Sequence, residues 1–201
     1  MANHCTGCAA ASTIRETFGP LVRAAAFGVA LLMGAASSAA AQSQADEYRV
    51  KAAFLFHFAQ LVAWPPDAVL SRKSFDLCTV GDDPFRGELE SQVEGKAIGS
   101  QTMHVRHLKL TQDVRGCQMI FAGREEAKEI SALLTLLGTA PVVTVGESDD
   151  FLLQGGIIRF CLEQNRIRFE INLDAAEKAK LKISSRLLLL AKSVIGNQGA
   201  R

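Results

Sequence analysis

Short apolar runs alternate with segments of mixed polarity through the middle of the chain. The apolar runs are rich in β-branched and aromatic residues and predict four strands, at residues 75–80, 101–108, 118–122 and 141–145. Helices are expected after three of these strands, one beginning near Pro84, one ending at about Leu137 and a short one ending at about Leu153. Apolar strands that alternate with helices indicate an α/β fold, a mostly parallel sheet with helices on both faces.

The pattern changes on either side of this region. A helix from Asp46 to Ala63 is predicted to precede it, because Trp64-Pro65-Pro66 stops a helix. The apolar residues of this helix surround its axis, so we expect one side to pack on the domain and the other to meet a second layer or another chain. Beyond the alternating region we predict a C-terminal β-hairpin and two closing helices, at residues 156–162, 166–171, 173–179 and 184–194.

The last predicted helix carries four consecutive leucines, Leu187 to Leu190, and then Ala191, Val194 and Ile195. One helix face does not need this much apolar surface. The segment therefore either completes the hydrophobic core or offers a hydrophobic groove or ridge to a partner. The sequence leaves both interpretations open.

The first forty residues have the order of a secretory signal peptide. Arg15 and Arg23 lie in a polar opening, residues 24–36 form an apolar run, and Ala39-Ala40-Ala41 precede Gln42. The apolar run of 13 residues is short of the roughly 20 that a membrane-spanning helix needs. We therefore predict a signal peptide at residues 1–41 and a single domain at residues 42–201 that works outside the cytoplasm.

Charge and cysteine content narrow the partners and the compartment. The formal net charge of +1 provides no basic excess to displace counterions from phosphates, so no nucleic-acid partner is expected. After removal of a signal peptide, Cys78, Cys117 and Cys161 allow one disulfide and a free thiol, or three thiols, and an oxidising compartment favours the first. The strands near Cys78 and Cys117 can be neighbours, which makes a bridge geometrically possible. Cys161, in an apolar hairpin strand, is expected to be a buried free thiol.

Three predicted strands end in glycine followed by polar residues. Asp82, Arg124 and Ser148 would meet at the carboxyl ends of the strands, where open parallel sheets bind ligands, and we call this the strand-end crevice. The alternative interpretation is that the glycines make tight turns and the polar residues cap the following helices.

Catalytic and metal-binding motifs are missing from the sequence. It contains neither Gly-x-Ser-x-Gly nor His-Glu-x-x-His. His104 and His107 lie on one predicted strand and point to opposite faces, so they cannot share a metal ion without distortion. His57, on the apolar first helix, is expected to be a core or interface histidine. We predict no enzyme activity, no metal site and no cofactor.

Three segments of the chain resemble the YfiR family. They are Val50-Lys51-Ala52-Ala53-Phe54-Leu55 with the following Trp64-Pro65, Gly155 to Phe160, and Ile167 to Ser185, of which Phe169 to Ser185 is the most specific. The resemblance covers nearly all of the mature chain, and the spacing of the first two mature cysteines is similar to that of the family's disulfide. Two departures stand out: His57 occupies a position that usually carries Asn or a similar polar residue, and a second cysteine pair of some members is absent.

The resemblance implies a periplasmic repressor. Such a protein binds the periplasmic sensor part of an inner-membrane diguanylate cyclase and thereby controls cyclic diguanylate signalling and biofilm formation. An outer-membrane peptidoglycan-associated lipoprotein would relieve repression by sequestering it, and a homodimer is also expected. The motif residues implied to shape the partner-facing surface, each with a capping or hairpin role as the alternative, are Glu170, Asn172, Asp174, Lys182 and Ser184. The rival function is a periplasmic small-ligand sensor that uses the strand-end crevice.

Overall fold

The computed structural model describes residues 44–70, 72–109, 112–124 and 129–196. Within these residues the strands are β1 (Val62–Ala63), β2 (Ser74–Val80), β3 (Ala97–Ile98), β4 (Gln101–Leu108), β5 (Met119–Ala122), β6 (Val143–Gly146), β7 (Ile158–Glu163), β8 (Arg166–Asn172), β9 (Lys182–Ile183) and β10 (Ser193–Ile195). The N-terminal helix is described over residues 44–61, and the other helices are α2 (Pro66–Leu70), α3 (Glu88–Val93), α4 (Ile130–Leu137), α5 (Leu173–Lys178) and α6 (Ser185–Leu190). The predicted signal peptide, residues 1–41, lies outside the described residues.

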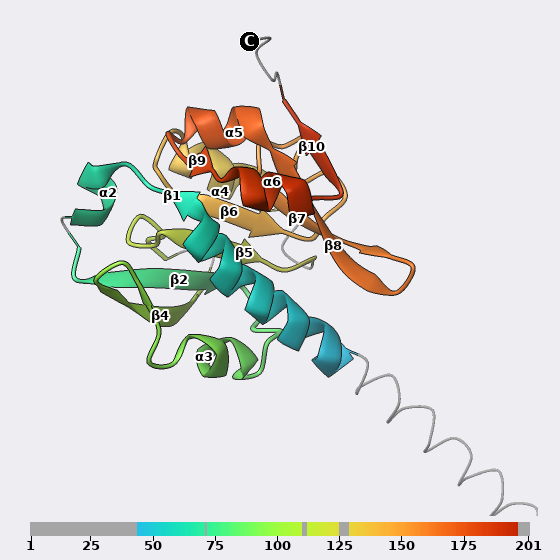
Figure 1. The fold of residues 1–201 in the computed structure, drawn as a ribbon, viewed down its shortest axis with the longest axis horizontal. Coiled ribbons are helices and arrows are strands. Elements are labelled where there is room, and N and C mark those ends of the chain that lie inside the picture. Colours follow the sequence, from blue (N-terminus) through green and yellow to red (C-terminus); the bar gives the residue numbers. More distant parts are fainter. Residues whose placement is uncertain (1–43, 71, 110–111, 125–128, 197–201) are drawn as a thin grey trace, which may run out of the picture. The chain divides into compact units, whose positions relative to one another are not determined.

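The main sheet has the strand order β10-β8-β7-β6-β5-β2-β4-β3, as Figure 1 shows. Pairing is parallel from β4 through β2, β5 and β6 to β7, and again between β8 and β10. The β7–β8 hairpin and the short β3–β4 pair are antiparallel. Gln164 and Asn165 turn the hairpin with φ angles of 48° and 59°, the left-handed conformation of a tight two-residue turn. The predicted mostly parallel α/β fold with a C-terminal hairpin is confirmed.

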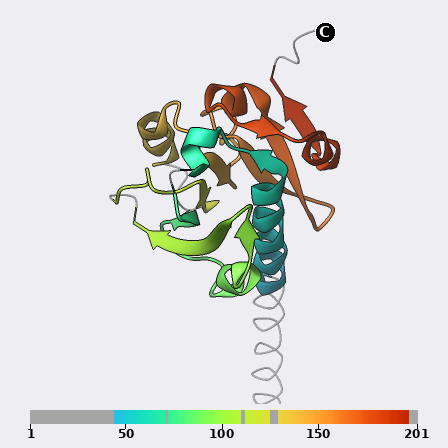
Figure 2. The ribbon, with the colours of Figure 1, turned by 60° about the vertical axis from the view of Figure 1, so that its left-hand side comes forward.

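Helices cover both faces of the sheet, as predicted. On one face the N-terminal helix and α3 pack against inward residues such as Leu77, Phe121 and Val145. On the other face α4 packs against alternate residues of the same strands, among them Cys78 and Ile120. Figure 2 shows the N-terminal helix running across its face of the sheet, with α3 beside it. Strands buried on both sides explain why the sequence contains continuous apolar runs.

The N-terminal helix is anchored by aromatic side chains. Phe58 is fully buried, and its ring centroid lies 4.9 Å from that of Phe169 and 5.6 Å from that of Phe160. Phe54 packs on the same two rings. Val50 is 43% exposed and His57 is also exposed, with Nδ1 3.2 Å from Gln60 Oε1, so no second layer within the described residues covers this side of the helix. That another chain covers it stays a prediction. His57 is therefore not a core histidine.

Two helix boundaries differ from the prediction because local side-chain and strand contacts compete with the helix. The N-terminal helix ends at residue 61, and Val62 and Ala63 form β1, which pairs with β9. The helix expected near Pro84 begins only at Glu88. Asp83 first accepts hydrogen bonds from the backbone N–H groups of Phe85 (3.0 Å) and Arg86 (3.1 Å), which forms a turn before the helix can start.

The end of the chain also differs from the prediction. The helix expected over 184–194 stops at Leu190, because Ala191 is extended (ψ 143°) and residues 193–195 join the sheet edge as β10. Leu187 is 1% exposed and completes the core, whereas Leu189 is 85% exposed. One leucine of the run is therefore part of the hydrophobic core, while others lie on the surface. Core packing accounts for only part of the segment, and the exposed part remains available to a partner.

A series of hydrogen-bonded turns replaces the short helix expected to end at Leu153. These turns fold back over the ring of Phe151, which is 1% exposed. Gly146 and Gly156 lie at opposite edges of the ring. A Cβ atom on Gly146 would lie 2.3 Å from Phe151 Cδ2, and one on Gly156 would lie 2.2 Å from Cε1. Both positions therefore require glycine for the close approach of the ring.

Replacing Gly156 with alanine is expected to destabilise the fold by about 1–3 kcal/mol, because the added methyl group must displace a buried ring in a filled core. Urea denaturation followed by circular dichroism measures the effect. Gly123→Ala is the matched control, since a Cβ there meets no atom within 4 Å. Equal stabilities of the two variants would contradict the proposed role of the Phe151 ring.

None of the helices in the described ranges combines the length and the hydrophobicity that crossing a bilayer requires.

Candidate functional site

The strand-end crevice has a different environment from the one the sequence predicts. Asp82 and Arg124 follow β2 and β5 and are exposed. Ser148 follows β6 and is buried, and no described residue is a hydrogen-bond partner of its Oγ atom. None of the three side chains lines the cavity that the structure shows elsewhere in the domain. Their role in ligand binding stays a prediction.

A buried ion pair lies at this end of the sheet. Lys51, from the N-terminal helix, places Nζ 2.7 Å from Oε1 of Glu147, the residue directly after β6, and both side chains are 4% exposed. Glu47, one helical turn before Lys51, also pairs with the ammonium group. The lysine thus has two carboxylate partners, which compensates its removal from water. The N-terminal helix is joined to the carboxyl end of β6 by this contact.

Two aromatic residues enclose the ion pair. The Tyr48 hydroxyl donates to Glu147 Oε2 at 3.2 Å, and the Lys51 ammonium lies 4.3 Å from the Tyr48 ring centroid. Phe85 packs edge-on against Tyr48 at 5.3 Å between centroids. Burial raises the pKa of the Tyr48 phenol well above its usual value, and the negative charge of Glu147 raises it further, so the hydroxyl stays a hydrogen-bond donor.

Sequence reasoning missed this cluster. The available signal was Lys51 itself, a single charged residue in an otherwise apolar stretch of helix. Lysine is almost never fully buried unless it is paired, so a lysine on this helix indicates a carboxylate partner. Its partner Glu147 is 96 residues away along the chain, and no local pattern identifies it.

Glu170, the first of the residues implied to shape the partner-facing surface, is mostly buried. Its side chain is 15% exposed, and its Oε2 accepts hydrogen bonds from Nε (3.0 Å) and Nη2 (2.7 Å) of Arg159 on the neighbouring strand. Arg159 also binds Asp149 Oδ1 at 2.7 Å. Burial acts to raise the pKa of Glu170, but hydrogen bonds from Arg159 and Ser193 outweigh it and hold the pKa below its usual value. Glu170 therefore links β8 to β7 and β10.

Asn172 and Ser184 cap helices. Asn172 Oδ1 accepts from the backbone N–H of Ala175 at 3.0 Å at the start of α5, and its Nδ2 donates to the Leu152 carbonyl at 3.0 Å. Ser184 Oγ accepts from the backbone N–H of Leu187 at 3.3 Å at the start of α6. These contacts favour the capping alternative for both residues, while a role in partner binding stays untested.

Asp174 and Lys182 are the exposed members of the motif. Asp174 lies in the first turn of α5, and Lys182 lies in β9, opposite Ala63 of β1. The backbone N–H of Ser184 donates to the Leu61 carbonyl at 3.0 Å, which brings this segment beside the end of the N-terminal helix. Of the five candidates, these two are the side chains best placed to meet another molecule.

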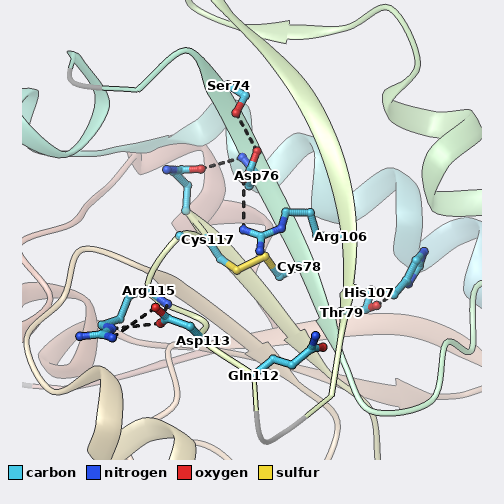
Figure 3. Close-up of a disulfide and its surroundings, with 12 residues drawn as sticks. Ser74, Asp76, Cys78, Thr79, Arg106, His107, Gln112, Asp113, Arg115 and Cys117 are labelled. Carbon is cyan, nitrogen blue, oxygen red and sulfur yellow. Dashed lines mark hydrogen bonds and ion pairs between the residues drawn. A yellow bond between two sulfur atoms is a disulfide. The ribbon is translucent and has the colours of Figure 1, made fainter.

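The structure contains a disulfide between Cys78, in β2, and Cys117, two residues before the start of β5 (Figure 3). Their Cα atoms are 5.9 Å apart, since β2 and β5 are neighbours in the sheet. Both residues are buried. Arg72 donates to the carbonyls of Arg115 (3.0 Å) and Gly116 (2.7 Å), which holds the loop that precedes Cys117. Cys161 is a free thiol and is partly, not fully, buried.

The histidines of β4 do not form a metal site. His104 is exposed, and His107 contacts Thr79 Oγ1 at 2.7 Å through Nδ1 and Glu90 Oε1 at 2.5 Å through Nε2. In the part of the chain that the structure describes, no group of three or more His, Cys, Asp or Glu residues could hold a metal ion.

The solved structures that resemble this chain include one of low sequence identity. A crystal structure of a conserved domain protein from Vibrio cholerae O1 biovar eltor strain N16961 is similar with a TM-score of 0.47 and 11% sequence identity, over 65% of this chain and 57% of that one. This chain therefore spans little more than half of that protein's length. No curated protein matches the sequence.

The chain also matches the family described as YfiR/HmsC-like, over residues 48–192. The matched region begins at Tyr48, close to the buried ion pair, and continues past α6, so it contains the disulfide and every candidate motif residue. The members of this family are periplasmic regulators of cyclic diguanylate signalling and are not known enzymes. Because the match extends over most of the chain, this protein belongs to the YfiR/HmsC-like family.

Proposed function

We propose that this protein binds the periplasmic sensor part of an inner-membrane diguanylate cyclase and represses the cyclase. The observation that carries the proposal is the family match across residues 48–192. An outer-membrane peptidoglycan-associated lipoprotein that sequesters the repressor, and a homodimeric state, belong to the same proposal. Export to the periplasm through the predicted signal peptide is part of it as well.

The surface of the domain offers contacts that suit a binding protein. Exposed apolar side chains remain on α6 and β10, with Leu189 at 85%, Leu190 at 58% and Ile195 at 39%. β10 is also the last strand of the sheet, so one of its edges is unpaired within the described residues. These features support the proposal that the C-terminal part of the domain contacts a partner.

Deleting the gene tests the proposal directly. Loss of a repressor should raise cellular cyclic diguanylate and biofilm mass, and restoring the gene should reverse both. Cyclic diguanylate is measured by mass spectrometry of nucleotide extracts. If the deletion leaves its level unchanged under conditions in which the protein is produced, the repressor proposal is excluded.

Lys182→Glu tests the partner-facing surface. Because Lys182 is exposed, the melting temperature should stay close to that of the wild type, since such substitutions usually cost within about 0.5 kcal/mol. Recovery of the cyclase by co-purification from host membranes should fall severalfold. Lys109→Glu makes the same charge change at an exposed position directly after β4, which belongs to a different sheet from β9, and should leave recovery unchanged. Equal recovery with both variants would assign the motif a purely structural role.

Glu170 is a poorer probe of the surface than the sequence suggests. Charge reversal there would leave Arg159 without its carboxylate partner on β8, so a loss of binding could reflect a loss of stability.

A further inference from the structure

A cavity lies near the amino-terminal ends of β6 and β7, whereas the strand-end crevice follows the carboxyl ends of the strands. It has a volume of about 320 Å³ and is formed by the end of α4, the start of β6, the segment before β7, and α5. Small ligand sites begin at roughly 300 Å³, so its size is at the lower end of that range. Its apolar wall consists of Leu134, Leu137, Val142 and Ile157.

Two polar groups on the cavity wall have unused hydrogen-bonding capacity. Thr144 is 5% exposed, and its Oγ atom accepts from the backbone N–H of Ile157 at 3.1 Å, but no described residue accepts the proton of its hydroxyl. Gln154 donates through Nε2 to Asp150, which fixes the orientation of its amide, and its Oε1 is buried with no hydrogen-bond partner in the described ranges. One unused donor and one unused acceptor are therefore found among the residues that line the cavity.

The charges around the cavity favour a neutral ligand. The charged side chains among its lining residues are Asp174 and Lys178, one turn apart on α5, which are exposed and of opposite sign. The two polar groups with unused capacity, the Thr144 hydroxyl and the Gln154 carbonyl, are uncharged, so a ligand with a charged head group would lose its hydration there without a countercharge.

We propose that this cavity binds a small uncharged molecule that carries a carboxamide on an apolar body. A carboxamide N–H donates to Gln154 Oε1 while its carbonyl accepts from the Thr144 hydroxyl, and the apolar body packs on Leu134, Val142 and Ile157. Such a ligand satisfies both unused groups at once. The site is separate from the strand-end crevice and does not depend on the repressor function.

Benzamide is the probe, and the experiment is a titration of the full ¹⁵N-labelled chain followed by two-dimensional NMR. We expect saturable shifts of the backbone amides of Gly155, Ile157 and Ala175. Benzoate, which is charged, and acetamide, which lacks the apolar body, should bind about tenfold more weakly or worse, as the loss of one well-made interaction predicts.

Two variants localise the binding. Ala175→Leu fills the cavity from a partly exposed position of α5 and should abolish the benzamide shifts, whereas Ala132→Leu, on the exposed side of α4, should leave them unchanged. Thr144→Val should weaken binding about tenfold and Thr144→Ser should retain it. Thr144→Val also removes the hydrogen-bond acceptor for the Ile157 N–H. If that variant does not fold, the comparison of Ala175→Leu with Ala132→Leu tests the proposal instead.

Several results would overturn the proposal. Absence of benzamide shifts would mean that ordered water alone satisfies Thr144 and Gln154. Equal binding of acetamide and benzamide, or unchanged binding to Ala175→Leu, would also overturn it. None of these results bears on the deletion test of the repressor proposal, so the two can fail independently.

Discussion

Replacing Lys51 with methionine is expected to destabilise the protein by about 3–5 kcal/mol, the usual effect of removing one partner of a buried ion pair. The reason is that Glu147, whose side chain is 4% exposed, would keep its charge in the protein interior without the ammonium group 2.7 Å away. Denaturant unfolding measures the loss, which is a large fraction of the stability of a typical domain. Because the N-terminal helix carries Lys51, the loss should appear as weaker docking of that helix on the sheet.

Two further variants separate this effect from a general effect of charge. Arg49→Met removes a neighbouring cation that pairs with Asp46 on the surface, where both side chains are at least half exposed, and should change stability by less than about 1 kcal/mol. Lys51→Met combined with Glu147→Leu removes both buried charges and should recover most of the loss. A double variant as unstable as the Lys51 variant would show that the charge of Glu147 is not the cause.

Replacing both Cys78 and Cys117 with alanine is expected to lower the free energy of unfolding by about 4 kcal/mol. The two residues are 39 positions apart, and the loss of unfolded-state entropy on closing a loop of that length accounts for this value. The disulfide is buried between β2 and the loop before β5, where that loop is already held by Arg72. Thermal unfolding of the wild type with and without a reducing agent measures the same quantity, and the double variant should not respond to the reductant.

Cys161→Ala is the control for the disulfide, since this free thiol lies in the β7–β8 hairpin and takes no part in the bridge. Its unfolding should still respond to reduction. Non-reducing peptide mapping should link residues 78 and 117, and finding Cys161 in the bridge instead would contradict the strand order described here.

The local pattern of apolar residues was sufficient to predict much of the fold. The strand at 101–108 was predicted with the limits that the structure has, and the runs at 75–80 and 118–122 differ by one residue at one end. These predictions succeed because a strand buried on both faces requires a continuous apolar run, which is visible in the sequence. Two of the boundaries that failed, at residues 62–63 and 191–195, lie where a strand from elsewhere in the chain pairs with the segment and stops a helix.

The candidate sites show more clearly which features follow from local sequence and which depend on contacts between distant segments. By itself, the sequence determined the α/β class, the hairpin and the family motif, because each depends on neighbouring residues or on a fixed spacing along the chain. Only the tertiary structure decided that Lys51 is buried against Glu147 and that Glu170 is held by Arg159. It also decided that the cavity lies at the amino-terminal ends of the strands, away from the predicted crevice. The partners in each case come from separate elements, and the free energy of burying a charge or a polar group depends on what surrounds it in space, which spacing along the chain does not encode.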